Sequence, residues 1–176
     1  MGEAAAEIDV TVDYDINREN FWDKGLQFST EALTEDVQIS GHPVLRLWLS
    51  SSVNDADVVA RIDDVAADGT ATYRTVEGRL RASLRKLTEP PYNNLGLPYH
   101  PFSEDSVQPL VPGEAVELQF DFYTISNVFK KGHKIRLTLN FAEQRATKKI
   151  NPAPTVTIHH GGERRSTLIL PVIPRQ

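Results

Sequence analysis

The sequence predicts an all-β fold, a sandwich of two β-sheets, and three observations support this. Apolar and polar residues alternate in 116–122 and again in 135–141, and a period of two is that of strands with one buried face and one solvated face. The pair Asp68-Gly69 lies between two alternating segments, which is typical of a tight β-hairpin. No segment keeps a helical period over ten residues. Short strands at this spacing favour a two-sheet sandwich.

The composition fits a folded domain and limits its partners. The 176 residues are enough for one domain with its own core. The formal net charge of -5 argues against nucleic acid as a partner. There are no cysteines, which excludes disulfides and thiolate metal sites.

No apolar run approaches the roughly 20 residues of a membrane span. The first residues, MGEAAAEIDV, are acidic and lack the basic start of a signal peptide. We therefore expect a soluble, cytoplasmic protein without membrane contact.

We expect residues 1–25 to form an N-terminal arm with a short strand, and residues 26–176 to form the sandwich. Within the arm, apolar residues alternate with polar ones over 8–14. The aromatic pair Phe21 and Trp22 follows in a polar segment, so we expect both rings to lie on this sandwich or on a neighbouring domain.

The strands of the sandwich follow from alternation and from turn residues. We expect them at 26–30, 37–40, 44–52, 58–65, 70–77, 79–87, 116–122, 135–141, 155–160 and 166–173. Gly78 is expected to open the strand 79–87. The connection 123–134 is too long for a two-residue hairpin and too short for a crossover helix, so we expect the chain to pass there from one sheet to the other. Pro171 and Pro174 indicate that the last strand lies at an edge.

One long segment, 88–113, shows no alternation and contains six prolines. A loop of this length inside a compact domain is usually functional or forms a contact surface. Among the scattered histidines, His100 lies in this loop and is therefore the one most suited to touch a ligand or a partner.

The sequence contains no catalytic motif such as G-x-S-x-G, H-E-x-x-H or a P-loop. We predict no catalytic, cofactor-binding or metal-binding residue, and no hydrolysis by this chain alone. An esterase with an unrecognised site stays open as a third possibility. Five aspartates near two turns are more typical of turn caps than of a calcium site: Asp55, Asp57, Asp63, Asp64 and Asp68.

Two further features have alternative interpretations. The basic residues Arg79, Arg81 and Arg85 form either a solvated strand face or a stripe that docks on an acidic surface. Trp22 and Trp48 are either buried at a sheet surface or exposed as platforms for sugar rings. The second interpretation of the tryptophans would make the protein a carbohydrate-binding module.

Several stretches resemble, in order, the C-terminal domain of X-Pro dipeptidyl-peptidases and of the cocaine esterase-like (CocE/NonD) hydrolases, a group that includes glutaryl-7-aminocephalosporanic-acid acylases. The resemblance covers about residues 26–174 and rests on SGHPVLRLWLSSSVNDADVVARIDDVAADGTATYRTVEGRLRASLRKL, PYNNLGLPYHPF, PLVPGEAVELQFDFYTISNVFKKGHKIRLTLNFAE and STLILPVIP. Its most specific part is VFKKGHKIRL at 128–137.

The resemblance implies a non-catalytic, galactose-binding-domain-like jelly roll that accompanies an α/β-hydrolase domain with a Ser-Asp-His triad. The family cleaves Xaa-Pro dipeptides or acyl esters and amides. None of the triad residues maps onto this sequence. The implied partner is the hydrolase domain, fused or in trans, with a homo-oligomer as a further possibility. The candidate residues for docking or for the cleft are Phe21, Trp22, Arg79, Arg81, Arg85, Tyr92, Asn93, Asn94, Tyr99, His100 and Phe102.

Overall fold

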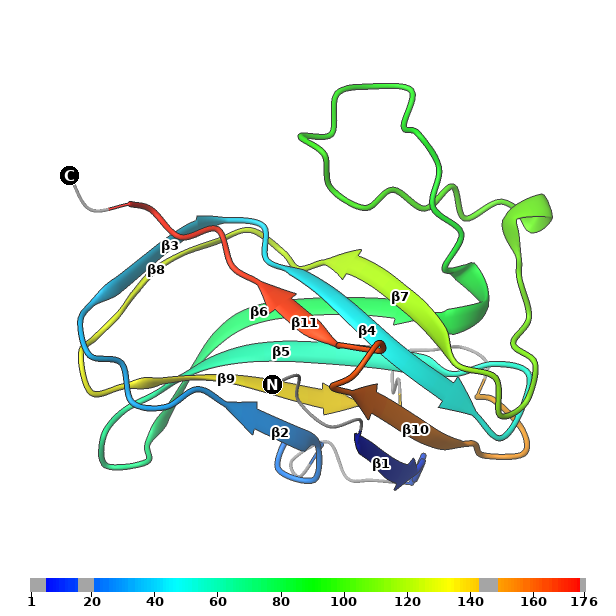
Figure 1. The fold of residues 1–176 in the computed structure, drawn as a ribbon, viewed down its shortest axis with the longest axis horizontal. Helices are drawn as coiled ribbons and strands as arrows, with labels where there is room; N and C mark the ends of the chain where they lie inside the picture. Colours follow the sequence, from blue (N-terminus) through cyan, green and yellow to red (C-terminus); the bar gives the residue numbers. More distant parts are fainter. Residues whose placement is uncertain (1–5, 16–20, 143–148, 175–176) are drawn as a thin grey trace.

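The computed structural model describes residues 6–15, 21–142 and 149–174, and the side chains of 73–75 are outside this description. Two sheets face each other, with a two-stranded ribbon at one end (Figure 1). Sheet A contains β1 (Ala6–Thr11), β10 (Thr155–His160), β4 (Val44–Ser51), β7 (Val116–Asp121) and β11 (Thr167–Ile169). Sheet B contains β2 (Leu26–Ser29), β9 (Lys134–Asn140), β5 (Asp57–Val65) and β6 (Ala71–Arg81). The ribbon pairs β3 (Val37–Gly41) with β8 (Ile125–Phe129). The all-β sandwich is confirmed.

The core lies between the sheets and is built by the alternating apolar positions. In β4 the side chains of Leu45, Leu47 and Leu49 are buried, and β7 opposes them with Phe120 and Leu118 in register. Because side chains alternate across a strand, Trp48 points to the outer face of sheet A. The predicted orientation of this strand is confirmed.

The chain passes from sheet A to sheet B between β7 and β9, as the length of the connection predicted. β7 pairs with β4 in sheet A, and β9 pairs with β5 and β2 in sheet B. Between them β8 joins neither sheet, because among the described strands it pairs with β3 alone. The sequence did not predict this separate ribbon.

The hairpin at Asp68-Gly69 is also confirmed. β5 and β6 pair antiparallel around it. The Ala66 backbone N–H donates to the Thr70 carbonyl at 2.8 Å. Gly69 has a φ of 87°, a positive value that favours glycine.

Gly78 does not open a new strand, and that prediction is wrong. β6 runs without interruption from Ala71 to Arg81. The glycine has another role: a Cβ at Gly78 would lie 2.9 Å from the Asp121 carbonyl oxygen and 3.1 Å from the Phe120 ring. A glycine is therefore needed for β6 to approach β7, which closes that side of the sandwich.

The alternation predicted for 79–87 also ends early. After Arg81 the chain forms the short 3-10 helix η2 (Ala82–Leu84), in which Ala82 and Ser83 are buried. A second 3-10 helix, η3 (Glu104–Ser106), lies within the long loop. In the part of the chain that is described, no helix is long and apolar enough to cross a membrane.

Candidate docking surface

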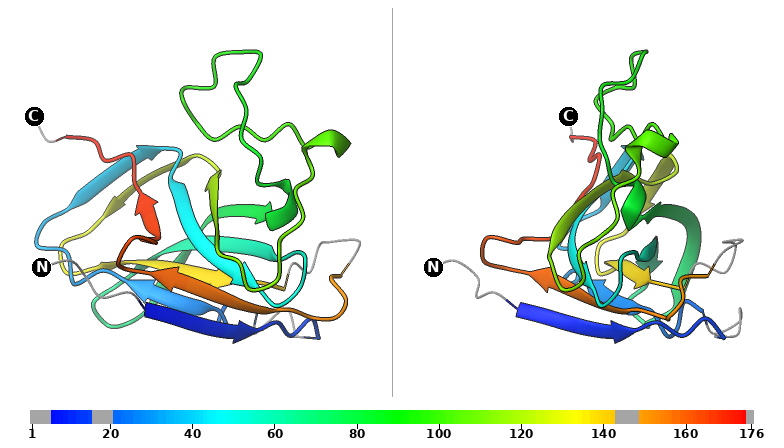
Figure 2. Two further views of the ribbon diagram at one scale, coloured as in Figure 1. Left: turned by 45° about the vertical axis from the view of Figure 1, so that its right-hand side comes forward. Right: turned by 90° about the vertical axis from the view of Figure 1, so that its right-hand side faces the viewer.

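The long loop 85–115 leaves the sandwich after η2 and returns at β7. Figures 1 and 2 show that the first half of the loop projects away from both sheets in all three views. Its length and prolines predicted a functional loop or a contact surface. The structure shows how its ends are held and which side chains it presents.

Backbone hydrogen bonds to the sandwich hold the returning half of the loop. The backbone N–H of Gln108 donates to the Ser83 carbonyl at 2.7 Å. Those of Leu110 and Gly113 donate to the carbonyls of Asn54 and Ser51, each at 2.8 Å. The loop therefore rests on two parts of the sandwich, next to η2 and after β4.

His100 connects the outgoing half of the loop to sheet A. Its side chain is buried, with Nδ1 at 3.2 Å from the Lys86 carbonyl oxygen and Nε2 at 2.9 Å from the Gln119 carbonyl oxygen. Both partners accept hydrogen bonds only, so a protonated ring donates both bonds and a neutral ring donates one. His100 is thus an internal anchor of the loop and not a group on its surface.

Asparagine side chains shape the tip of the loop. The Leu95 backbone N–H donates to Asn93 Oδ1 at 3.0 Å, and that of Gly96 donates to Asn94 Oδ1 at 3.2 Å. The Asn94 amide also donates to the Leu97 carbonyl at 2.6 Å. Asparagine commonly bonds the backbone two residues on in this way. Asn93 and Asn94 therefore fix the conformation of the tip.

Leu95 is held at this tip in an unusual conformation. Its φ is 61° and its side chain is 81% exposed. Phe102, with φ 50° and 62% exposure, is the other non-glycine residue with positive φ in the described residues. Such a conformation costs a bulky residue about 1–2 kcal/mol. Backbone strain and solvent exposure thus coincide at two large apolar side chains.

Exposed apolar side chains are concentrated on the long loop. Of the eleven large hydrophobic residues exposed in the described structure, six lie within 85–115: Leu87, Tyr92, Leu95, Phe102, Val107 and Val111. Tyr92 rests edge-on against Tyr99, with ring centroids 5.8 Å apart. A concentration of this kind marks an interaction site more often than scattered single residues do.

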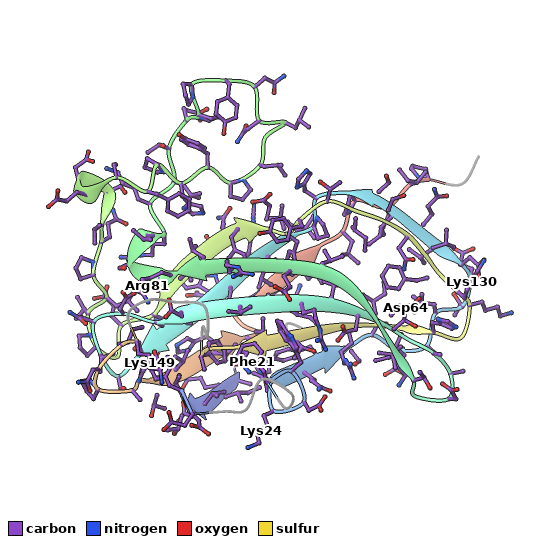
Figure 3. The ribbon with its side chains drawn as sticks, turned by 180° about the vertical axis from the view of Figure 1, so that it is seen from behind. Phe21, Lys24, Asp64, Arg81, Lys130 and Lys149 are labelled. Atoms are coloured by element: carbon purple, nitrogen blue, oxygen red, sulfur yellow. The ribbon has the colours of Figure 1, made fainter. Side chains whose placement is uncertain are left out.

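The predicted pair Phe21 and Trp22 lies elsewhere, on the outer face of sheet B. Figure 3 shows Phe21 over the strands of sheet B, apart from the long loop. Phe21 is buried, and its carbonyl accepts a 2.7 Å hydrogen bond from the Asn140 amide. The Trp22 ring lies 4.3 Å from the Arg61 guanidinium carbon. Of the two surfaces considered for these rings, the structure shows them on this sandwich.

The three arginines of the predicted stripe are engaged within the domain. Arg79 Nη2 donates to Glu77 Oε2 at 3.0 Å, and Arg81 binds Asp57. Arg85 donates to the carbonyls of Ala82 and Gln108 at the base of the loop, and burial lowers the pKa of its guanidinium. Arg81 lies below the loop in Figure 3. Arg81 and Arg85 thus support the loop from the sandwich.

All five aspartates are bonded to groups of the protein itself, and Arg81 lies beside two of them, 2.8 Å from Asp57 and 3.9 Å from Asp55. Asp63 is fully buried and accepts from Arg136 Nη2 at 3.1 Å, while its other oxygen lies 2.8 Å from Arg61 Nε. Asp55 is bound by the Ser83 hydroxyl and Asp57 by Arg81. Asp64 is bound by His133, and Asp68 by the Thr70 backbone N–H. The described residues hold no group of three or more metal-ligating side chains.

A serine, a histidine and a glutamate are bonded in sequence on the outer face of sheet A. Ser50 Oγ lies 3.0 Å from His159 Nε2, and His159 Nδ1 lies 2.9 Å from Glu7 Oε1. A hydrolase triad has the same sequence of hydrogen bonds, from serine to histidine to a carboxylate, but Ser50 is only 5% exposed. The three residues stand on β4, β10 and β1, so their bonds tie three strands of sheet A together.

Two groups of residues were missed or misplaced from sequence. Leu87, Leu95, Val107 and Val111 were not candidates, although an apolar residue between Asn94 and Gly96 was a usable signal for Leu95. His159 was not singled out either, and it is buried. Trp48 is half-buried on the outer face of sheet A. A groove of about 490 Å³ opens between the two sheets, and neither Trp22 nor Trp48 is among its lining residues.

Comparison with known families agrees with this architecture. Residues 5–169 match the model of the X-Pro dipeptidyl-peptidase C-terminal non-catalytic domain. Among curated relatives, a Mycobacterium bovis protein provisionally named a serine esterase is 35% identical over 154 residues, covering 85% of this chain and 24% of that protein. The cocaine esterase of a Rhodococcus species is 31% identical over 169 residues, covering 87% of this chain and 26% of the esterase. The chain thus spans about a quarter of these relatives.

Solved structures share the fold. A CocE/NonD family hydrolase from Staphylococcus aureus superposes with a TM-score of 0.78 at 18% identity, covering 98% of this chain and 33% of that one. An aminopeptidase from a marine sediment archaeon of the Thaumarchaeota superposes with a TM-score of 0.69 at 20% identity, covering 97% of this chain and 33% of that one. In both structures this fold is one part of a larger chain.

Proposed function

The chain belongs to the family of X-Pro dipeptidyl-peptidase C-terminal non-catalytic domains, and from this membership we propose that it packs on an α/β-hydrolase catalytic domain through its long loop. The hydrolase domain is either fused to this one or bound in trans. In this arrangement the domain is a structural part of a serine hydrolase, and the chemistry takes place on its partner.

The observation that carries the proposal is the presentation of Leu95 and Phe102. Both are large, apolar, exposed and held at positive φ. Neither feature improves the stability of the isolated domain. Both become favourable when the side chains enter apolar sites on a partner, because burial of each removes apolar surface from water.

The direction of the loop supports a role at the substrate cleft. It projects beyond the sandwich (Figure 2). In a catalytic domain bound to the tip of the loop, Tyr92, Leu95 and Phe102 would therefore form one wall of the substrate cleft. The names of the relatives suggest an esterase as the parent enzyme, with dipeptidyl-peptidase or acylase activity as the family's other reactions. Contacts between copies of the domain are a second use of the same surface.

Reconstitution from separate polypeptides tests the proposal. The catalytic domain of a CocE/NonD-type hydrolase from the same organism is produced without its C-terminal domain, and binding of the present chain is measured by isothermal titration calorimetry. We expect a 1:1 complex, a higher melting temperature of the catalytic domain and altered KM values for p-nitrophenyl esters. A failure to bind, with both partners folded by circular dichroism, would reject the proposal for action in trans. The fused protein with and without 85–115 shortened would then test it in cis.

A further inference from the structure

Sheet A has a gap at one edge, beside the middle of β4. β10 pairs with Trp48–Ser51 of β4, and β11 pairs with Val44–Arg46. Between these two partners the segment 161–166 leaves the sheet, and Figure 2 shows this connection projecting outward. Leu47 therefore has no strand partner on this side. The sandwich is open here, next to the edge strand β2 of sheet B.

The opening is a groove of about 490 Å³ with an apolar floor and walls. This volume falls in the range of roughly 300–1,000 Å³ that is usual for small-molecule sites. The floor and walls are formed by nine apolar side chains that come from both sheets, among them Leu47, Ile158, Phe28, Leu137 and Leu168. Phe28, Leu137 and Leu168 are only half-buried, so the groove presents apolar surface to solvent.

The rim of the groove is polar and carries one sign of charge. It contains the hydroxyl groups of Ser29, Thr30 and Thr167, whereas the Ser166 hydroxyl donates to the His159 carbonyl at 2.8 Å. Among the described residues, the ionisable ones that line the groove are His160 and Arg165, and none is a carboxylate. His160 stands on the inner side of β10, edge-on to the Phe28 ring, with ring centroids 6.5 Å apart. A bound molecule would thus meet aliphatic carbon below and a cation with hydroxyl donors above.

We propose that this groove binds an amphiphilic anion, the carboxylate of a short to medium unbranched acyl chain. The chain would lie on the apolar floor, and the carboxylate would accept from Arg165 and from the hydroxyls of Ser29, Thr30 and Thr167, as charge complementarity requires. Sugars fit less well, because the lining residues that the structure describes include no tryptophan or tyrosine to stack on a ring. Residues of β2 and β11 line the groove, and both strands lie apart from the long loop in Figure 1, so this site is separate from the proposed docking surface.

Octanoate is the probe for the test, in a titration of the chain followed by methyl NMR of leucine and isoleucine. We expect saturable shifts with a millimolar Kd, confined to groove residues such as Leu137, Leu168 and Ile158. Octyltrimethylammonium and octanol, which have the same chain without the negative charge, should bind at least about tenfold more weakly. Equal binding by octyltrimethylammonium, or shifts that do not saturate, would overturn the proposal.

Two adjacent arginines provide a matched pair of variants. Arg165→Glu should weaken octanoate binding about tenfold or more, whereas Arg164→Glu, which borders a different groove beside Glu7, should leave it unchanged. Leu168→Trp should abolish binding by filling the groove, with folding checked by circular dichroism. Equal effects of the two arginine variants would reject a specific anion site. Loss of the shifts in the protein joined to its catalytic domain would show that the groove is an interface, and this also would overturn the proposal.

Discussion

Arg81 donates two parallel hydrogen bonds of 2.8 Å to Asp57, from Nε to Oδ1 and from Nη2 to Oδ2. The two residues are direct cross-strand partners at the end of the β5–β6 ladder, immediately before η2 and the long loop. The bond to Asp57 raises the pKa of Arg81. Arg81, which was expected on a docking stripe, therefore stabilises the strand ends from which the long loop starts.

Loss of this pair should destabilise the domain. Arg81→Met keeps most of the side-chain length but leaves the buried Asp57 carboxylate without its charged donors. We expect the free energy of unfolding in urea to fall by about 2 kcal/mol. Arg46→Met, at an exposed position of β4, is the control and should change it by less than about 0.5 kcal/mol. Equal losses in the two variants would contradict this role of Arg81.

The exposed tip should show opposite effects on stability and on docking. In Leu95→Asn the new residue tolerates positive φ, so we expect stability to stay constant or to rise by about 0.5–1 kcal/mol. Docking to the catalytic domain should weaken about tenfold or more, because the apolar anchor is gone. Tyr123→Asn is the control, since Tyr123 is 66% exposed and lies outside the loop. If Leu95→Asn lowers stability and leaves docking unchanged, the tip is not the contact.

Gly78→Ala should loosen the closed side of the sandwich. The added methyl group would meet the Asp121 carbonyl oxygen and the Phe120 ring at distances that force β6 and β7 apart. We expect a loss of about 2 kcal/mol in the free energy of unfolding. Thr72→Ala, an exposed change on the same strand, should cost less than half as much. Faster hydrogen exchange of β7 amides in Gly78→Ala would locate the effect.

The hairpin turn should lose stability in acid. The Thr70 backbone N–H donates to Asp68 Oδ1 at 2.8 Å, and this bond lowers the pKa of Asp68 below its ordinary value of 3.8. Because the pKa of Asp68 is lower in the folded protein than in the unfolded chain, the stabilisation is fully present at a pH above the pKa of the unfolded chain. It is lost as the pH falls through the pKa of the folded protein. An NMR titration of the Asp68 carboxyl group should show the shift. Asp68→Asn should keep the turn and remove this part of the pH dependence.

The Ser50, His159 and Glu7 bonds should serve structure and not hydrolysis. Because Ser50 is buried, we expect a fluorophosphonate probe to leave the chain unlabelled under conditions that label a serine esterase. Ser50→Ala should instead speed hydrogen exchange of β1, because the His159 ring loses the Ser50 bond that holds it in place beside Glu7 of β1. Labelling that disappears in both Ser50→Ala and His159→Ala would assign a second hydrolytic site.

The sequence was most informative where one side chain faces the core and the next faces solvent. The strands β4, β7 and β9 were predicted from alternation, and the β5–β6 hairpin from Asp68-Gly69. Alternation reports which face a residue occupies and not which strand lies beside it. For this reason the separate β3–β8 ribbon and the gap between β10 and β11 could not be predicted.

The candidate site was predicted in place but not in detail. The prolines located the loop, and the structure shows Tyr92 and Phe102 exposed on it, while their role in docking stays a prediction. His100 was expected to meet a partner, whereas its two nitrogens meet carbonyls of the domain itself. The conformation of Leu95 depends on hydrogen bonds from its neighbours, and leucine gives no signal of positive φ. Gly78 was taken for a strand boundary because its close approach to β7 involves residues more than 40 positions away.

The pairing of the first strands with the last ones affects how the protein is made. β1 binds β10, with Ala6 opposite His160, and β2 binds β9, with Leu26 opposite Leu139. On the ribosome neither sheet can be completed until most of the chain has emerged. A fold dominated by such distant pairings forms slowly, and its apolar strands stay exposed during synthesis. Chaperone binding to the nascent chain should therefore persist until β10 has emerged from the ribosome.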